Sequence, residues 1–293
     1  MELAKTAVAL GLFDGVHLGH RAVLAEACAQ RKKHLIPAVY TFEPESAVYK
    51  PDSSAGFIYG TEAKRKLMVE CGISGVIFAD FGAVRKLSGE EFAWKVLRER
   101  VNAMFVCCGR DFRFGRDASC GAEELKAFGK KYGFEVQVVE DVLFGDSIVS
   151  SREIRRMLTE GDIKGANTLL GKPYTVSGKV VDGSHIGHTI GFPTVNQLFG
   201  RGQLVPAYGV YSGTVCVDGE NYRTVTNIGV KPTIAGERSP LAETHILGYS
   251  GDLYGRELDV ELTGLIRPER RFASLDELKA QISEDVKFAG NDI

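Results

Sequence analysis

Short apolar runs alternate with amphipathic runs over the first half of the chain. The apolar runs are typical of parallel strands buried on both faces. They predict strands at residues 6–11, 36–42, 75–78, 105–109 and 135–139. The stretches between them repeat apolar residues at helical spacing and predict helices at residues 20–31, 62–71, 89–100 and 122–132. This alternation favours a doubly wound, Rossmann-like α/β domain with helices on both faces of a parallel sheet. Residues 43–61, with prolines and scattered Ser and Gly, predict a mobile loop.

The pattern changes after two further predicted helices, at residues 151–160 and 162–170. From there polar and apolar residues alternate, in runs rich in Val, Thr and Tyr. They predict strands at residues 174–181, 209–217, 222–228, 243–249 and 258–265. Turns such as Asp218-Gly219 separate them, which is typical of an antiparallel sheet closed into a small β-barrel.

A last helix follows the predicted barrel. Ser274 and Glu277 have the spacing of a capping box, in which each side chain accepts a backbone N–H at the helix start. Leu275, Leu278 and Ile282 form an apolar stripe along the helix. We therefore expect this helix to pack on the barrel.

The composition is that of an ordinary globular protein. A chain of 293 residues is long for one core, so we expect one domain at residues 1–170 and a second at residues 171–293. The net charge of −2, with no clustered basic stretch, argues against a nucleic-acid partner. The chain has no apolar run long enough to cross a bilayer and no signal-like start. We expect a cytoplasmic protein without a membrane partner.

The cysteines show no spacing that would bind zinc. They are Cys28, Cys71, Cys107, Cys108, Cys120 and Cys216, and they include no Cys-x-x-Cys pair. Cys107 and Cys108 are adjacent, so their side chains should point to opposite faces of a strand. Buried, reduced thiols are the expected state.

A glycine-rich segment joins the first predicted strand to the first predicted helix. From Gly11 to His20 it reads Gly-Leu-Phe-Asp-Gly-Val-His-Leu-Gly-His. A helix start presents unpaired N–H groups and a partial positive charge, and Gly15 and Gly19 let a phosphate approach the backbone. His17 and His20 are three apart, so both can donate to one phosphate group. Such a pair suits attack at the α-phosphate of a nucleotide. Read alone, the histidines could also serve only to cap and pack the helix.

A second candidate site lies in the β-rich half, where residues 191–196 read Gly-Phe-Pro-Thr-Val-Asn. Thr194 and Asn196 are two apart, so they share one side of an extended segment, and their oxygen atoms suit Mg²⁺ and phosphate. Glu243 begins a predicted strand, where it could aim into a cleft at the barrel rim and accept a hydroxyl proton. Alone, it would more often be a solvent-facing acid. His245, on the same face, is expected only to pack. Three glycines typical of turns precede the hexapeptide: Gly178, Gly183 and Gly187.

The first motif resembles the His-x-Gly-His signature of the nucleotidyltransferase superfamily. The longer string is similar to the FMN adenylyltransferase module of bacterial bifunctional riboflavin kinase/FAD synthetases, with further matches at residues 41–44, 111–115 and 149–155. The resemblance implies that ATP adenylylates FMN to FAD with release of pyrophosphate, and that His17 and His20 are the catalytic pair. It places the following residues at the ATP phosphates: Gly11, Phe13, Asp14, Gly15, Gly19, Ser150, Ser151 and Arg155. It places Asp111 and Phe112 at the flavin.

From residue 172 to about residue 285 the chain resembles riboflavin kinase. The matching stretches are residues 191–196, 207–211, 227–233, 243–245, 251–255 and 267–269. The resemblance implies phosphorylation of riboflavin to FMN, with Thr194 and Asn196 binding Mg²⁺ and ATP phosphate and Glu243 as the base. Gly178, Gly183, Gly187 and Pro193 belong to the implied ATP site.

Several residues depart from the family pattern. They are Leu12 in place of Asn, Glu45-Ser46 in place of His-Pro, Arg152 in place of Thr, Val195 in place of Ala, and His188 in place of Arg or Lys. Two alternatives therefore stay open. One is a riboflavin kinase whose adenylyltransferase module is degenerate. The other is a non-enzymatic flavin-binding or flavin-sensing protein, against which the acid Glu243 argues. The expected partners are riboflavin, FMN and ATP.

Overall fold

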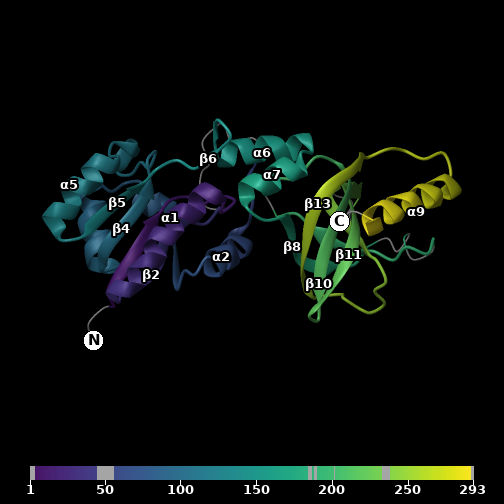
Figure 1. Cartoon of the computed structure of the whole chain (residues 1–293), viewed down its shortest axis with the longest axis horizontal. Helices are drawn as coiled ribbons and strands as arrows, with labels where there is room; N and C mark the ends of the chain where they lie inside the picture. The colour runs from purple at the N-terminus through teal and green to yellow at the C-terminus, as the bar shows by residue number, and fades with distance from the viewer. Residues whose placement is uncertain are drawn as a thin grey trace. The chain divides into compact units, whose positions relative to one another are not determined.

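A computed structural model describes residues 4–44, 56–183, 187, 190–200, 202–232 and 238–291. Its contacts divide the chain into two compact units, Met1–Ser151 and Arg152–Ile293 (Figure 1). Glu45, Ser46 and His188, which depart from the family pattern, lie outside the described residues. None of the helices within the described ranges is long and apolar enough to cross a membrane.

A parallel sheet forms the centre of the first unit, with strand order β3-β2-β1-β4-β5. The strands are β1 Thr6–Leu10, β2 Ile36–Phe42, β3 Gly75–Ala79, β4 Ala103–Gly109 and β5 Glu135–Val139. The order reverses between β1 and β4, and ligands of open α/β sheets bind at the carboxyl ends of strands at such a reversal. The loops that follow β1 and β4 therefore lie at the edge of the sheet where such ligands bind.

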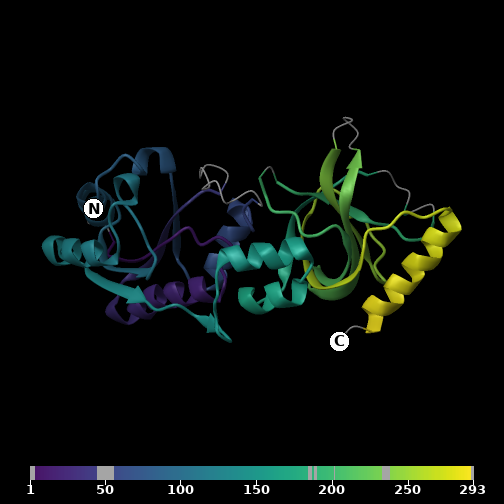
Figure 2. The ribbon, with the colours of Figure 1, turned by 90° about the horizontal axis from the view of Figure 1, so that it is seen from above.

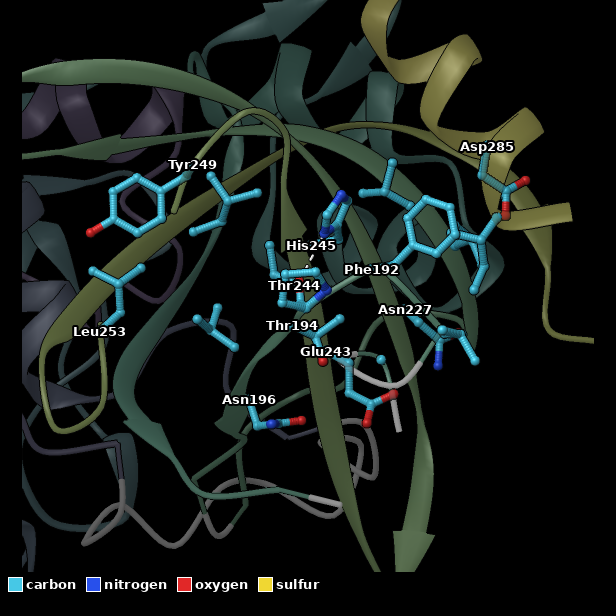
Figure 3. A pocket seen from close by; sticks show the side chains of 18 of the residues that line it. Phe192, Thr194, Asn196, Asn227, Glu243, Thr244, His245, Tyr249, Leu253 and Asp285 are labelled. Atoms are coloured by element: carbon cyan, nitrogen blue, oxygen red, sulfur yellow. Dashed lines mark hydrogen bonds between the residues drawn. The ribbon is translucent and has the colours of Figure 1, made fainter. Parts of the chain in front are cut away.

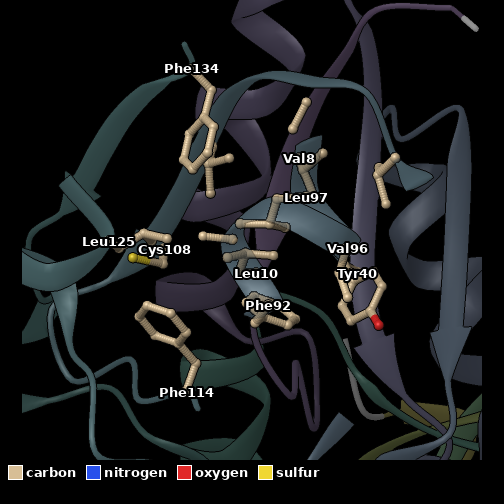
Figure 4. Packing of buried hydrophobic residues seen from close by; sticks show 14 of the residues in the cluster. Val8, Leu10, Tyr40, Phe92, Val96, Leu97, Cys108, Phe114, Leu125 and Phe134 are labelled. Atoms are coloured by element: carbon tan, nitrogen blue, oxygen red, sulfur yellow. The ribbon is translucent and has the colours of Figure 1, made fainter. Parts of the chain in front are cut away.

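Helices cover both faces of this sheet, which confirms the doubly wound, Rossmann-like fold. They are α1 Leu18–Ala29, η1 Gln30–Lys33, α2 Thr61–Glu70, α3 Phe81–Val84, α4 Gly89–Glu91, η2 Phe92–Arg100, η3 Arg116–Ala118 and α5 Ala122–Tyr132. On one face, the thiol of Cys107 lies 3.3 Å from the carbonyl of Val23 in α1. On the other, Cys108 packs in a core with Leu97 of η2 and Leu125 of α5 (Figure 4). The adjacent cysteines thus point to opposite faces, as predicted.

Two parts of this unit differ in detail from what the sequence suggested. Residues 89–100 are helical, as predicted, but a short α4 is followed by the π-helix η2. At the end of η2, the N–H of Val101 donates to the carbonyl of Val96, five residues back. Of the loop expected at residues 43–61, residues 45–55 lie outside the described residues. In the part that follows, Phe57, Ile58 and Tyr59 are buried. Their apolar side chains contribute to the core rather than to a solvated loop.

The second unit is a closed antiparallel barrel, as the sequence predicted, with strand order β10-β11-β12-β9-β8-β13. The strands are β8 Tyr174–Val181, β9 Val195–Leu198, β10 Gly209–Val217, β11 Glu220–Pro232, β12 Arg238–Ile246 and β13 Glu257–Pro268. The expected start of a strand at Glu243 was wrong, because β12 begins at Arg238. Pro240 suggests a strand break in the sequence, yet it pairs with Val230 in the ladder. Glu243 therefore lies well inside its strand.

Helices flank the barrel before and after it in the sequence. α6 Ser151–Glu160 and α7 Ile163–Leu170 precede β8, after the hairpin of β6 Leu143–Phe144 and β7 Ser147–Ile148, and α7 contacts β13. α9 Leu275–Asn291 lies against β10 and β11 (Figures 1 and 2).

The start of α9 differs in detail from the expected capping box. The hydroxyl of Ser274 accepts the N–H of Glu277, but the Glu277 carboxylate accepts the N–H of Ala273 rather than that of Ser274. Leu275, expected in the apolar stripe, is 63% exposed because it lies in the first turn, while Leu278 and Ile282 line a cavity of the barrel unit.

The expectation of uniformly buried thiols was also wrong. All six cysteines are free, and Cys107 and Cys108 are buried, but Cys216 is exposed. It lies between Val215 and Val217, whose side chains are buried in the barrel, so strand alternation turns it outward.

Candidate functional sites

The loop after β1 has an unusual backbone and leads into two stacked histidine rings. Phe13 and Val16 have φ angles of 51° and 44°, in the left-handed region that costs a non-glycine residue roughly 1 kcal/mol or more. The rings of His17 and His20 stack with centroids 3.6 Å apart, and the ring of Phe13 meets that of His20 edge-on at 5.3 Å. A strained segment of this kind persists only where its surroundings hold it in place.

His17 serves as the N-cap of α1. Its Nδ1 accepts the N–H of His20 at 3.4 Å. In a neutral imidazole whose Nδ1 accepts, the proton lies on Nε2, so Nε2 is the donor of the ring. The capping role and the phosphate-binding role are therefore compatible in one residue.

Hydrogen bonds from distant parts of the unit hold the loop. The buried carboxylate of Asp14 accepts the N–H of Ile58 at 2.9 Å, and the hydroxyl of Ser151 donates to the carbonyl of Asp14 at 2.8 Å. Asp14 and Ser151, which the sequence placed at phosphate, thus fix the loop's shape. Gly11 and Gly19 leave space for neighbouring rings. A Cβ on Gly11 would lie 3.1 Å from the Phe13 ring, and one on Gly19 would lie 3.2 Å from the His17 ring.

The residues expected at the flavin follow β4, beside the loop of β1. Asp111 is exposed, whereas the half-buried ring of Phe112 stacks on that of Phe114 with centroids 5.6 Å apart. Ser150 immediately precedes α6. Arg155 lies in α6, within the second unit, and its place at the phosphates stays a prediction.

In the barrel unit, three polar residues form a row across adjacent strands. Glu243 of β12 pairs directly with Asn196 of β9 on one side and with Asn227 of β11 on the other. Directly opposed side chains share a face, with Cβ atoms about 5 Å apart. Figure 3 shows the Glu243 carboxylate between the two amides. Asn227 belonged to a matched stretch of the sequence, but only the strand register shows that it lies beside Glu243.

Asn196 has an acceptor that a ligand could use. Its side chain is 4% exposed, and its Oδ1 has no hydrogen-bond partner among the residues that the structure describes. An unsatisfied buried oxygen costs about 1–3 kcal/mol, which a cation or donor would relieve. A Cβ on Gly183 would lie 2.2 Å from this amide, and one on Gly187 would lie 2.4 Å from the carbonyl of Phe192. Both glycines therefore permit close approach to the hexapeptide.

Gly178 differs from these two glycines. It lies within β8 and pairs with Leu258, and its carbonyl accepts from the amide of Gln197. It is part of a regular strand rather than of the turn expected from the sequence.

His245 fixes the segment that leads to Thr194. Its Nδ1 lies 2.8 Å from the carbonyl of Pro193, and its ring meets that of Phe192 edge-on at 5.5 Å. The structure therefore agrees with the packing role expected for His245.

A cavity of about 720 Å³ opens over this row of residues. Thr194, Asn196, Asn227 and Glu243 line one part of it (Figure 3). The remaining wall includes the apolar or aromatic side chains Phe192, Tyr249, Leu253, Tyr254, Phe272, Leu278 and Ile282. Polar oxygens beside an apolar wall suit a ligand with an apolar ring system and a polar end.

The described residues include no cluster of three or more His, Cys, Asp or Glu side chains that could hold a metal ion by themselves. A magnesium ion with few protein ligands is normal where substrate phosphates and water complete its octahedron. Thr194 and the open acceptor of Asn196 fit that donor set.

Comparison with known proteins assigns a class to each part of the chain. Residues 1–153 match the family model described as FAD synthetase, and residues 170–292 match the one described as riboflavin kinase. With the Rossmann-like unit and the barrel, these matches define a two-domain transferase of flavin nucleotides. The chain is 38% identical over 280 residues to the bifunctional riboflavin kinase/FMN adenylyltransferase of Escherichia coli strain K12, covering 94% of this chain and 89% of that protein. It is 34% identical over 282 residues to the protein of the same name from Pseudomonas fluorescens, covering 96% and 90%. The chain belongs to the bifunctional riboflavin kinase/FMN adenylyltransferase family.

A solved structure shares the fold over the whole length. It is described as a macrolide-efflux protein from Streptococcus pneumoniae, is 29% identical, and has a TM-score of 0.84 over 100% of this chain and 96% of that one.

Proposed function

We propose that the barrel unit phosphorylates riboflavin to FMN with ATP, and that the Rossmann-like unit adenylylates FMN to FAD with release of pyrophosphate. The observation that carries the kinase site is the row of Asn196, Glu243 and Asn227 on one face of the cavity. The observation that carries the adenylyltransferase site is the stacked histidine pair at the start of α1. The riboflavin kinase and the FMN adenylyltransferase activities named for the relatives are each supported by a matching family model. These matches favour the bifunctional enzyme over the kinase-only and non-enzymatic alternatives.

At the kinase site, the apolar wall binds the flavin rings and directs the ribityl chain toward Glu243. The Glu243 carboxylate accepts the proton of the 5′-hydroxyl as that oxygen attacks the γ-phosphorus of ATP, the bond from this phosphorus to the β,γ-bridging oxygen breaks, and ADP leaves. Thr194 and Asn196 orient the triphosphate and hold Mg²⁺ with it. When bound, the ion neutralises charge on the phosphate oxygens.

At the adenylyltransferase site, a phosphate oxygen of FMN attacks the α-phosphorus of ATP and pyrophosphate leaves. Nε2–H of His17 and the ring of His20 donate to the phosphates, while the start of α1 stabilises the developing negative charge. Asp111, which follows β4 and is exposed, contacts the flavin. We place both reactions in the cytoplasm because the composition of the chain is that of an ordinary globular protein.

One assay tests both sites, in which the full chain receives riboflavin, ATP and Mg²⁺ and FMN and FAD are resolved over time. Glu243→Gln keeps the shape of the side chain but removes the base, so FMN formation should fall about 100-fold or more. Asn196→Ala should also abolish it, whereas Glu220→Gln, an exposed acid on β11, should not change it. Near-normal FMN formation in Glu243→Gln or Asn196→Ala would remove the assignment of the kinase site.

His17→Asn tests the other unit, because Asn preserves an N-cap but lacks the imidazole donor. Supplied with FMN and ATP, this variant should form little FAD while it converts riboflavin to FMN at the normal rate. Normal FAD formation would contradict the role given to His17.

A further inference from the structure

A lysine is buried beside the adenylyltransferase loop, where the proposed reaction gives it no direct role. Lys64 of α2 is 2% exposed, and its ammonium donates to the hydroxyl of Thr41 at 2.9 Å and to the carbonyl of Phe42 at 3.0 Å. It also lies 5.7 Å from the ring centroid of Phe78. Taking an ammonium group out of water costs several kcal/mol, so a neutral side chain would fill this place at lower cost if packing were all that mattered.

The ammonium determines where the Thr41 hydroxyl proton points. Lysine has only donors, so the Thr41 oxygen must accept from it, and the one proton of the hydroxyl is left for another acceptor. That acceptor is the carbonyl of Leu12, 3.1 Å away. The Lys64 ammonium also polarises the Thr41 hydroxyl and so strengthens the hydrogen bond from this hydroxyl to the Leu12 carbonyl.

The Leu12 carbonyl belongs to the peptide that precedes Phe13, the residue with a φ of 51°. The ring of Phe13 packs on the ring of His20, which stacks on His17. A shift of this peptide would change the position of both imidazoles relative to the ATP phosphates of the proposed reaction.

We propose that Lys64 is a positioning residue for adenylyl transfer, acting through the Thr41 hydroxyl and the Leu12 carbonyl on the histidine pair. The inference rests on the proposed FAD synthesis. FAD formation by the unmodified chain tests that function separately from the variants below.

The experiment compares kcat and KM for FAD formation in full-length variants, with FMN formation by the same preparations as the internal control. Lys64→Met and Thr41→Val should each lower kcat for FAD formation about tenfold or more, since small displacements at a reacting centre cost up to about 100-fold. KM for ATP should change less than about threefold, because the helix start is untouched. Thr41→Ser retains the hydroxyl and should rescue the rate. Lys66→Met, an exposed lysine of the same helix, should leave both activities unchanged.

The double variant distinguishes a linked pair from two separate effects. If Lys64 acts through Thr41, Lys64→Met with Thr41→Val should be no slower than the worse single variant. Normal kcat in Thr41→Val would overturn the proposal, as would multiplication of the two losses in the double variant. If Lys64→Met does not fold, the pair Thr41→Val and Thr41→Ser decides alone. A lower Tm with normal kcat in Lys64→Met would show a purely structural role and would also refute the proposal.

Discussion

Removal of the Asp285 carboxylate should destabilise the barrel unit by about 3 kcal/mol. Asp285 of α9 has a side chain that is only 2% exposed, and it faces Arg267 of β13, whose side chain is 17% exposed. The guanidinium donates to the carboxylate from Nε at 3.1 Å and from Nη2 at 2.8 Å, and the amide of Gln281 donates to it at 2.9 Å. This pair ties the last helix to the barrel.

The expected magnitude follows from what Asp285→Ala leaves behind. Removing one partner of a buried ion pair costs about 3–5 kcal/mol, because the other charge stays buried without compensation. Arg267 keeps some contact with water, so the lower end of this range applies. For a unit of this size, 3 kcal/mol corresponds to a loss of roughly 10 °C in Tm.

The chain offers an internal reference for this measurement. Its one tryptophan, Trp94, lies in η2 of the first unit, so tryptophan fluorescence follows that unit while loss of FMN formation in urea follows the barrel. Asp285→Ala should lower the urea concentration at which FMN formation is lost, and should leave the fluorescence transition unchanged. Glu284→Ala, the exposed neighbour in α9, should shift neither. A change below about 1 kcal/mol in Asp285→Ala would refute the claim that this pair fixes α9.

Three further outcomes are expected. Gly183→Ala should weaken ATP use in FMN formation at least about tenfold in kcat/KM, since its Cβ would lie 2.2 Å from the Asn196 amide; unchanged kinetics would contradict this contact. The pKa of Glu91 is lowered to about 2 by the N–H of Ser88 and the neighbouring lysine, so the stability that it contributes is complete above about pH 5 and is lost as pH falls toward 2. The difference in Tm between the unmodified chain and Glu91→Gln should therefore vanish across that interval, as followed by tryptophan fluorescence. Alkylation with mass spectrometry should modify Cys216 first, because burial raises the pKa of both thiols on β4.

The sequence predicted the architecture because the elements differ in period. Continuous apolar runs between helices predict the parallel sheet, whereas alternating polar and apolar runs between turns predict the barrel. Both patterns can be read without tertiary information. The failures were local. The apolar residues of η2 predicted a helix but not its π-type hydrogen bonding, and Pro240 concealed the first half of β12.

The candidate residues were recognisable from motifs, but their partners were not. Nothing near Asn196 in the sequence indicates that it faces Glu243, because barrel closure sets that pairing. A lysine in a short amphipathic helix gives no sign that it is buried, so Lys64 became visible only through its contacts with the end of β2. The left-handed backbone of Phe13 has no sequence signal either, since that conformation is unfavourable for an aromatic residue.

The two sites depend on different kinds of support, and this predicts different sensitivity to distant change. Asn196, Glu243 and Asn227 are held by ladder hydrogen bonds of three paired strands, which a single side-chain substitution outside the row leaves intact. The histidine pair follows a strained loop whose shape depends on individual side-chain hydrogen bonds. Each of those bonds can be removed by one substitution. FAD formation should therefore be lost through more single substitutions remote from the reacting atoms than FMN formation, although one chain carries both activities.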